Sequence, residues 1–444
     1  MELIGSDHAR YDEERAIFNA MIDKRPASIA RCTSVRDVQD ALALARGQGL
    51  AVAVRAGGHS VAGFCLNDGG LVIDVRSMNA VEVDPDRRTV RVGAGTTWGE
   101  LDRATQEHGL ATTGGRVSTT GVAGLTLGGG SGWLERRYGL ACDNLRSVDM
   151  VTVDGRTVTA SADENPDLFW ALHGGGGNFG IATTFEFDLH PVGPEVLAGL
   201  LVWPGDAGYE IGRAYRDMAF DAPDELGSAL VFLTGPPEEF VPAHLQGQTV
   251  AALALLWAGD VADGEDAIAD LRALGPEVDL VGPMPYADFQ CMIDDPPGHG
   301  NYWSADYHDT MPDEALDTFV KYGFERRSAL SQQILVPWGG AVARVPEDAT
   351  PMTHRDVRWI SHPFAVWDLA EDDTEANIEW AKGFRRDIAA HTNGGVYLNF
   401  IGQEGEDRIR AAFGEEKYRR LQHVKAEWDP DNVLQGNQNI RPAR

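Results

Sequence analysis

Glycine-rich loops carry the residues of this 444-residue chain whose types and spacing could do chemistry. The first loop, residues 55–60 (Arg-Ala-Gly-Gly-His-Ser), follows an apolar strand candidate, Ala51–Arg55. A sharp turn of this kind exposes successive backbone N–H groups, which can bind the anionic diphosphate of a cofactor. His59 stands at the tip of the turn and would lie beside that ligand. A lone histidine in a glycine-rich turn can also have a purely structural role.

The longest glycine cluster runs from Gly114 to Asn144 and has apolar residues interleaved throughout. Each glycine in such a segment costs about 0.5–1 kcal/mol of backbone entropy relative to alanine. The interleaved residues, among them Val122, Trp133 and Leu140, argue against a flexible linker. The segment therefore predicts backbone that wraps closely around a large, flat ligand.

A third cluster, Gly175–Gly180, matches the G-x-G-x-x-G spacing of a dinucleotide-binding fingerprint. That fingerprint requires a strand before it and a helix after it, so that the helix N-terminus faces the pyrophosphate. Here a helix candidate, Asn165–Leu172, precedes the glycines and a strand candidate, Ile181–Leu189, follows them. The reversed order disfavours a nicotinamide-dependent dehydrogenase, although the glycines can still bring bare backbone close to a ligand.

Alternating strands and helices must position these loops. The spacing of apolar residues predicts a helix over Asp37–Gln48, with Ser34 placed to cap it, and a second over Thr97–His108, ended by Gly109. Asp154-Gly155 is a strong hairpin signal. Further strands are expected at Leu71–Asp74, Thr89–Val92, Val148–Val153 and Thr157–Ala160. This mixture indicates an α+β domain.

The middle of the chain has fewer glycines and a pattern of strands covered by helices. Strands are expected at Val196–Val202, Leu230–Thr234, Thr249–Trp257 and Ser331–Val336. Helices are expected at Ala207–Ala219, Gly264–Leu274, Asp313–Gly323 and Asp373–Thr392. A last helix, Glu415–Trp428, ends before Pro430, because proline cannot continue a helix.

Composition excludes several classes of function. The chain has 38 basic and 68 acidic residues, a net charge of −30, which disfavours binding to nucleic acid. We find no apolar stretch long enough for a membrane span and no secretory signal, so a soluble, cytoplasmic protein is expected. The four cysteines are too scattered for a disulfide framework or a metal site. The scarcity of lysine fits either adaptation to high salt or a genome that favours arginine codons.

Taken together, these motifs resemble the berberine-bridge-enzyme-like FAD-linked oxidases, which have the vanillyl-alcohol-oxidase fold. The resemblance is carried, in order, by residues 55–60 with Leu71–Asp74, by Gly114–Asn144, by Asp167–Leu172, by Tyr397–Phe400 and by Asp429–Asn432. It implies an α+β fold: a two-subdomain PCMH-type FAD-binding domain (1–193) and an α/β substrate domain (194–394) with an antiparallel sheet covered by helices. A berberine-bridge-like segment (395–444) would return to the first domain.

The resemblance implies that His59 is bonded to the 8α-methyl of FAD. Some members of the family add a second link through a cysteine, but Val117 occupies that place here, so a single link is expected. Cys142 lies in a different stretch and is interpreted as a small buried residue. The other expected cofactor contacts are Arg55, Ala56, Gly57, Gly58, Ser60, Thr119, Gly121, Gly124, Gly128, Asp143, Asn144, Gly180, Ile181, Asn399 and Asn437.

The resemblance also suggests residues for the substrate side. Trp303, Trp338, His362 and Tyr397 are expected to line the pocket, and Tyr397 and Gln333 to take part in catalysis. An unperturbed tyrosine has a pKa of about 10, so Tyr397 would need a lowered pKa to act as a base at neutral pH. A second family tyrosine is replaced by Phe400, which carries no proton.

The activity implied is oxidation of a C–H beside a hydroxyl or an amine on a small molecule such as a sugar, an alcohol or a natural-product intermediate. Dioxygen is the expected electron acceptor, because the small Thr120 falls where the family admits or blocks oxygen. The alternatives are a dehydrogenase with another acceptor and a flavin-carrying protein that binds a small molecule without turnover. No nucleic acid, membrane or metal is expected to take part.

Overall fold

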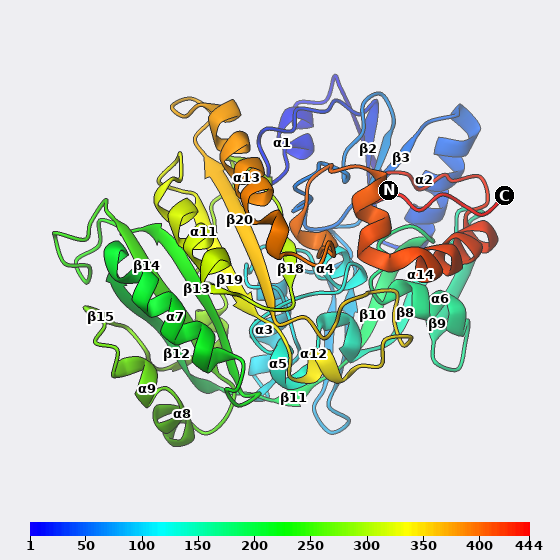
Figure 1. Cartoon of the computed structure of the whole chain (residues 1–444). Helices are drawn as coiled ribbons and strands as arrows, with labels where there is room; N and C mark the ends of the chain where they lie inside the picture. The colour runs from blue at the N-terminus through cyan, green and yellow to red at the C-terminus, as the bar shows by residue number, and fades with distance from the viewer.

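Three larger sheets and one two-stranded ribbon organise the chain, and the computed structural model describes all residues 1–444. Figure 1 shows a large sheet with helices across one side, while the N-terminal elements and α14 lie together at the other end of the molecule. None of the helices combines the length and the apolar character that crossing a bilayer would require.

The first sheet has four strands in the order β1-β2-β4-β3, with β2 and β3 both parallel to β4. The strands are β1 Glu2–Gly5, β2 Ser28–Arg31, β3 Val52–Arg55 and β4 Leu71–Asp74, and α1 spans Tyr11–Arg15. The helix predicted over residues 37–48 is confirmed as α2, Val35–Gln48. It begins at Val35 because the hydroxyl of Ser34 accepts the backbone N–H of Asp37.

The second sheet is antiparallel, in the order β5-β6-β10-β8-β9. Its strands are β5 Val81–Asp84, β6 Thr89–Gly93, β8 Leu145–Val151, β9 Thr157–Ser161 and β10 Ile181–Asp188. The hairpin predicted at Asp154-Gly155 is confirmed, since it joins β8 to β9. A two-stranded ribbon pairs β7, Leu110–Ala111, with β11, His190–Pro191.

The helices of this half are short. Helix α3, Trp98–Gln106, begins with a capping box between Thr97 and Glu100 and ends two residues earlier than predicted. The others are α4 Val122–Leu127, α5 Glu135–Tyr138, the 3-10 turn Ala141–Asn144 and α6 Pro166–Leu172. Helix α6 precedes the Gly175–Gly180 run and β10 follows it, so the reversed order inferred from the sequence is confirmed.

The third sheet has nine antiparallel strands, ordered β15-β12-β14-β13-β19-β20-β17, with β16 beside β12 and β18 beside β20. The strands are β12 Glu195–Pro204, β13 Leu226–Thr234, β14 Thr249–Trp257, β15 Val278–Asp279, β16 Gly282–Pro285, β17 Gly300–Trp303, β18 Asp306–His308, β19 Gln332–Pro337 and β20 Trp359–Trp367. Strand β20 was not predicted. All nine of its residues are buried, so it lacks the alternation of a half-exposed strand.

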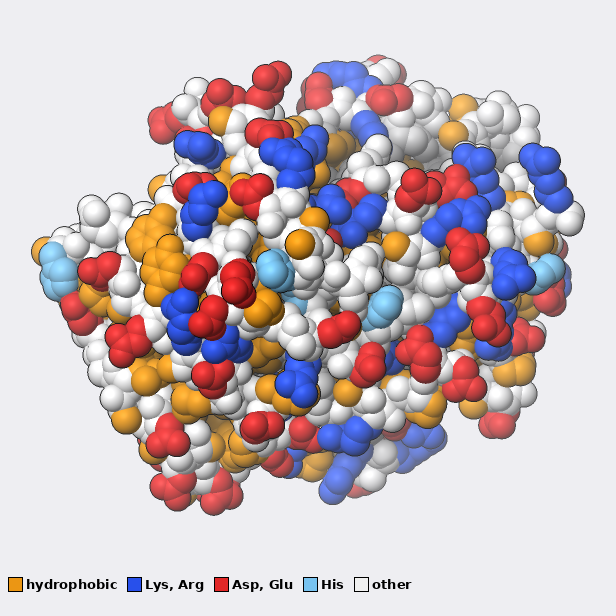
Figure 2. Space-filling model, viewed as in Figure 1, with side chains coloured by type: hydrophobic (Ala, Val, Ile, Leu, Met, Phe, Trp, Pro, Cys, Tyr) orange, Lys and Arg blue, Asp and Glu red, His pale blue; other side chains and the backbone are white.

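Helices cover one face of this sheet (Figure 1). They are α7 Gly208–Ala219, α11 Asp313–Phe324 and α13 Thr374–Ile388, and they share a core with alternate residues of the strands. The predicted helix over 264–274 is two short helices, α8 Val261–Ala267 and α9 Ala269–Arg272. Short α10, Tyr286–Phe289, and α12, Ala341–Arg344, lie in connections. On the outer face of this layer, acidic and basic side chains are interspersed (Figure 2).

The C-terminal helix α14, Glu406–Trp428, is longer than predicted because two helices meet at a kink at Gly414. Near its end, the side chains of Lys425 and Asp429 form an ion pair of 2.7 Å that is completely buried. The ammonium of Lys425 also donates to the carbonyl oxygens of Asn178 and Leu434. The pair therefore ties α14 to the third glycine loop.

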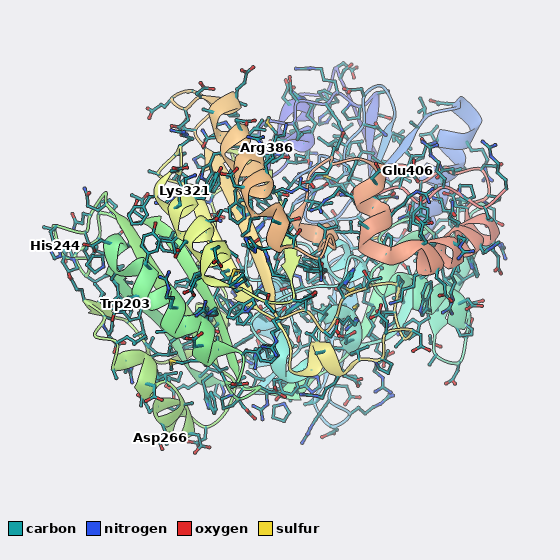
Figure 3. The ribbon with its side chains drawn as sticks, in the orientation of Figure 1. Trp203, His244, Asp266, Lys321, Arg386 and Glu406 are labelled. Atoms are coloured by element: carbon teal, nitrogen blue, oxygen red, sulfur yellow. The ribbon has the colours of Figure 1, made fainter.

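We expect Lys425→Met to lower the free energy of unfolding by about 3–5 kcal/mol, because it leaves the carboxylate of Asp429 buried without its counter-charge. Lys321→Met is the matched control. Lys321 is half-exposed on α11 (labelled in Figure 3) and lies 3.6 Å from Asp387. Its replacement should change stability by less than about 1 kcal/mol. Urea unfolding of both variants tests this, and an equal effect at the two positions would contradict it.

Candidate active site

A cavity of about 700 Å³ lies between the glycine loops and the nine-stranded sheet. One side is formed by residues 56–62, 120–128, 174–177 and 180–182, and the opposite side by β12, β13, β14, β19 and β20. Residues 398–401 and 434–438 close the cavity from the C-terminal segment. Segments far apart in the sequence thus meet at one site.

The first glycine loop presents an unusual run of mostly free donors. None of the five backbone N–H groups from Gly57 to Val61 donates to a backbone carbonyl oxygen, and only that of Ser60 has a side-chain acceptor, the sulfur of Cys65. Gly58 has a φ of +75°, and a Cβ at Gly57 would lie 2.2 Å from the backbone nitrogen of Gly121. The two loops therefore touch backbone to backbone, which only glycine allows. Successive donors without a carbonyl partner on a cavity fit an anionic group such as the diphosphate of FAD.

His59 lines this cavity, as predicted from its place in the loop. Its Nε2 lies 2.9 Å from the hydroxyl oxygen of Thr119, and its Nδ1 lies 3.4 Å from that of Thr120. The ring stacks on Phe18 with centroids 4.2 Å apart. Burial lowers the pKa of His59 to about 4. The imidazole is therefore neutral at physiological pH, with a nucleophilic ring nitrogen.

Arg55 does not line the cavity, contrary to the expectation that it contacts the cofactor. Its buried guanidinium donates to the carbonyl oxygens of Glu14 and Ala16. Two residues on, the backbone N–H of Phe18 donates to the carbonyl oxygen of Gly58. Arg55 thus fixes the N-terminal segment that supports the His59 ring.

The other expected cofactor residues divide into two groups. Those on the cavity are Ala56, Gly57, Gly58, Ser60, Gly121, Gly124, Gly128, Gly180, Ile181, Asn399 and Asn437. Thr119 reaches it only through its bond to His59. The expectation for Asp143 and Asn144 is corrected, because neither lines the cavity. Asp143 is paired with Arg355 at 2.8 Å, and Asn144 bonds the backbone of Tyr138 and Leu140.

The two positions considered for a second covalent link differ in their surroundings. Val117 lies on the cavity wall, whereas Cys142 is fully buried beside Asp143 and Arg355. Burial raises the pKa of the Cys142 thiol. The side chain that faces the cavity therefore has no nucleophilic atom, and the nucleophilic one is buried away from it.

His362, on β20, lines the cavity with a free ring nitrogen. Its Nδ1 lies 2.7 Å from the carbonyl oxygen of Ser304 and must be the protonated nitrogen, because a carbonyl only accepts. Nε2 then carries a lone pair and has no hydrogen-bond partner in the protein. The ring stacks on Phe400, with centroids 4.3 Å apart, and its edge meets Trp303. Burial lowers the pKa of His362 to about 4, so it is neutral at pH 7.

Tyr397 does not lie on this cavity, which corrects the expectation of a pocket tyrosine. Its phenol oxygen accepts the backbone N–H groups of Gly130 and Ser131 at 2.7 and 2.8 Å, and the side-chain amide of Asn399. Burial raises the pKa of Tyr397 further above its ordinary value. Tyr397 is therefore a protonated anchor for the second glycine loop and cannot serve as a base near neutral pH.

Gln333 and Trp338 are also placed differently from expectation. Alternate residues of β19, Gln332 and Ile334, face the cavity, so Gln333 points to the helix-covered face of the sheet. It pairs there with Phe232, which packs on helix α11. Trp338 is fully buried against Tyr397, with ring centroids 5.9 Å apart. Trp303 does line the cavity.

Arg116 is a cavity residue that sequence reasoning did not single out. Its guanidinium donates to Ser131 and to the carboxylate of Glu135, each at 2.9 Å, and lies over the ring of Trp133. A basic residue next to a glycine motif is a weak signal on its own. Its contacts depend on residues 15 to 19 positions further along, which no local pattern announces.

A buried carboxyl joins the two halves of the molecule behind the cavity. Asp102 on α3 accepts the side-chain amide of Gln290, which also donates to the carbonyl oxygen of Gly115. Burial raises the pKa of Asp102 to about 7. The carboxyl of Asp102 therefore keeps its proton up to about neutral pH.

This raised pKa predicts a pH dependence of stability. An unfolded aspartate has a pKa of about 3.9, so between about pH 4 and pH 7 only the folded chain holds the proton. The free energy of unfolding contributed by Asp102 must therefore fall as the pH rises through this window, by up to about 4 kcal/mol. Asp102→Asn should be more stable than the unmodified chain at pH 8 and gain less at pH 5. Urea unfolding at both values tests this, and a pH-independent difference would contradict it.

Comparison with known proteins agrees with this site. Residues 26–161 match the family described as "FAD binding domain", and residues 396–441 match the family described as "Berberine and berberine like". (R)-6-hydroxynicotine oxidase of Paenarthrobacter nicotinovorans is 31% identical, covering 99% of this chain and 96% of that protein. Xylooligosaccharide oxidase of Thermothelomyces thermophilus is 29% identical, and the match covers 96% of this chain and 89% of that protein. The crystal structure of 6-hydroxy-D-nicotine oxidase from Arthrobacter nicotinovorans superposes with a TM-score of 0.90 at 28% identity. The match covers 100% of this chain and 98% of that structure.

The fold and the family match define an FAD-linked oxidoreductase with a PCMH-type FAD-binding domain. The chain belongs to the berberine-like FAD-linked oxidoreductases. The resemblance, the α+β fold class, the FAD cofactor and the enzymatic nature predicted from the sequence are thereby confirmed.

Proposed function

We propose that this chain is an oxidase that carries FAD bonded to His59 and removes hydride from a C–H beside a hydroxyl or an amine. The accompanying proton goes to a side chain of the cavity, and dioxygen is reduced to hydrogen peroxide. The observation that carries the proposal is the run of N–H groups without a carbonyl partner from Gly57 to Val61, with His59 inside it on the cavity. FAD supplies the hydride-accepting chemistry when it is bound.

The proposed division of labour follows the two sides of the cavity. Residues 1–193, together with 395–444, would hold the cofactor through the glycine loops, Asn399 and Asn437. Residues 194–394 would bind the substrate through the nine-stranded sheet. Since the (R)-6-hydroxynicotine and xylooligosaccharide oxidases are relatives, a small-molecule substrate is proposed here as well.

His59 and Val117 support a single covalent link. A neutral imidazole is the form that can bond to the 8α-carbon, and the burial of His59 keeps it neutral. The Thr119 and Thr120 hydroxyls, on the two ring nitrogens, orient that imidazole. Val117 offers no second bond, and Cys142 lies away from the cavity.

His362 is the group we propose to accept the substrate proton. Its Nε2 lone pair opens onto the cavity while the bond from Nδ1 to Ser304 holds the ring in one tautomer. The cavity has no tyrosine or lysine on its walls. Two carboxylates also line the cavity: Asp294 already accepts the N–H and hydroxyl of Ser118, and Asp295, whose pKa burial raises to about 6, lies in the loop after α10, outside the row of β20 that carries His362.

The experiment is acid denaturation followed by peptide mass analysis, together with measurement of peroxide over a panel of amines, alcohols and sugars. A peptide containing His59 should carry the mass of FAD, and none containing Val117 or Cys142 should. Thr120 lies on the cavity and supports dioxygen as acceptor. Flavin that is reduced by substrate but reoxidised only by an artificial acceptor would make the enzyme a dehydrogenase. Ligand binding without reduction would make it a binding protein.

A further inference from the structure

The wall of the cavity opposite the glycine loops is formed by one face of the nine-stranded sheet. Because side chains alternate along a strand, every second residue of β12 points into the cavity. Val202 lines it, whereas its neighbour Trp203 (labelled in Figure 3) belongs to the core beneath the helices. On β13, Val231 lines the cavity in the same way and Phe232 joins the helix-side core.

A row of five side chains crosses this wall. The printed register pairs Val202 with Ala252, Ala252 with Val231, Val231 with Ile334, and Ile334 with His362. All five line the cavity. Neighbouring strands lie about 4.8 Å apart, so the aliphatic part of the row extends for about 14 Å. The row therefore offers an apolar strip that ends at one imidazole.

Apart from His362, the polar groups of the cavity lie outside this row. Arg116 and Ser131 are bonded to each other, and Asp294 is bonded to Ser118. Gln332 pairs with Phe364 on the next row, and Asp295 belongs to the loop after α10. A hydroxyl placed against the aliphatic strip would lose its water without finding a protein partner.

Partly exposed residues of the cavity wall are apolar as well. Phe240, Leu280 and Met292 line it and are 53%, 37% and 37% exposed. Phe240 lies in the connection between β13 and β14, which is marked by His244 in Figure 3. Exposed apolar side chains on the wall of a cavity indicate that apolar surface binds there.

Resting on the proposed function, we infer that the substrate is a mostly apolar molecule, aromatic or terpene-like, with one hydroxyl or amine as its reacting group. Its apolar body lies on the strip from Val202 to Ile334. The reacting O–H or N–H faces Nε2 of His362, which is 4% exposed and has no other partner. Oligosaccharides, which carry a hydroxyl on nearly every carbon, are excluded by the same strip.

Binding of three probes to the anaerobic holoenzyme tests this inference: 1-phenylethanol, 1-(2-naphthyl)ethanol and xylobiose. Flavin absorbance and the fluorescence of Trp133 and Trp303, which line the cavity, report binding. We expect the naphthyl alcohol to bind about five- to tenfold more tightly than the phenyl alcohol, because a second ring buries more apolar surface. Xylobiose should give no saturable change. Equal binding of the two alcohols, or tight binding of xylobiose, overturns the inference.

Val231→Thr provides a matched variant, since it adds one hydroxyl at nearly constant volume to the middle of the strip. It should weaken binding of the naphthyl alcohol by about fivefold or more. Val320→Thr makes the same change in α11, on the opposite face of the sheet, and should leave binding unchanged. An unchanged dissociation constant in Val231→Thr, with the fold intact, overturns the inference.

The same measurements separate this inference from the proposed oxidase. Naphthyl alcohol that binds tightly without reducing the flavin, while xylobiose does not bind, supports the apolar site and counts against the oxidase. Reduction of the flavin by xylobiose supports the oxidase and overturns the apolar substrate.

Discussion

Replacing His59 with alanine is expected to leave the acid-precipitated polypeptide colourless, with all of the flavin in the supernatant. Alanine has no atom that can bond to the 8α-carbon, and the neutral His59 ring lies on the cavity beside the N–H groups that lack a carbonyl partner. Since those groups remain, the variant should still bind FAD reversibly. The substrate reduction rate should fall by about tenfold or more, because the bond that raises the flavin potential and fixes its orientation is lost.

Cys142→Ser is the control for this prediction. Cys142 is fully buried beside Arg355 and does not reach the cavity, so the variant should keep its flavin through acid precipitation. Retention of colour by His59→Ala, or its loss in Cys142→Ser, would contradict the assignment. Visible absorbance of the redissolved pellet, followed by peptide mass analysis, distinguishes these results.

His362→Gln is expected to slow flavin reduction by about 10²–10⁴-fold. Glutamine keeps an oxygen that can accept a hydrogen bond but cannot accept a proton, so substrate binding should change much less than the rate. In the unmodified enzyme, the rate should be constant above about pH 5 and fall tenfold per unit below about pH 4. The cause is protonation of His362, whose pKa is lowered to about 4, mainly by burial and to a smaller extent by the charge of Arg116. The variant should lose this acid limb.

His308→Gln is a close match for a control. His308, on the adjacent strand β18, is also buried with its pKa lowered to about 4. Both of its ring nitrogens have partners, the carbonyl oxygen of His391 and the hydroxyl of Ser361, and it does not line the cavity. Anaerobic stopped-flow reduction across pH 3.5–8 is the measurement. A normal rate in His362→Gln, or an equal loss in His308→Gln, would refute the role of His362 as proton acceptor.

Local signals in the sequence predicted many of the helices and strands. Strands Leu71–Asp74 and Thr249–Trp257 have the predicted bounds, and the helix capped by Ser34 begins within two residues of its predicted start. These elements could be predicted because the residues that determine them lie within a few positions: a cap, a turn or a short apolar run. Strand β20, Trp359–Trp367, was not predicted because Ser361, His362 and Pro363 interrupt its apolar run, and a proline within a run argues against a strand.

The glycine-loop side of the cavity could also be predicted from the sequence. A turn that leaves free N–H groups is encoded by the glycines themselves, and the structure places His59 in that turn on the cavity. The side of the cavity formed by the nine-stranded sheet was predicted less well. The sequence analysis placed Gln333 in the pocket, whereas its neighbour Gln332 lines the cavity. Successive side chains of a strand point to opposite faces of the sheet, so an error of one residue selects the wrong face.

The amino-acid sequence by itself determined the class of this protein, because its glycine loops, its capped helices and its closing Asp429–Asn432 turn are local and appear in order. The tertiary structure alone decided which side chains can react. The phenol oxygen of Tyr397 accepts backbone N–H groups from a loop about 266 residues earlier in the chain. The Nε2 lone pair of His362 is free because the carbonyl oxygen of Ser304, in another strand connection, fixes the tautomer of the ring. Burial and long-range hydrogen bonds set the proton affinities of both groups, and neither can be read from neighbours in the chain.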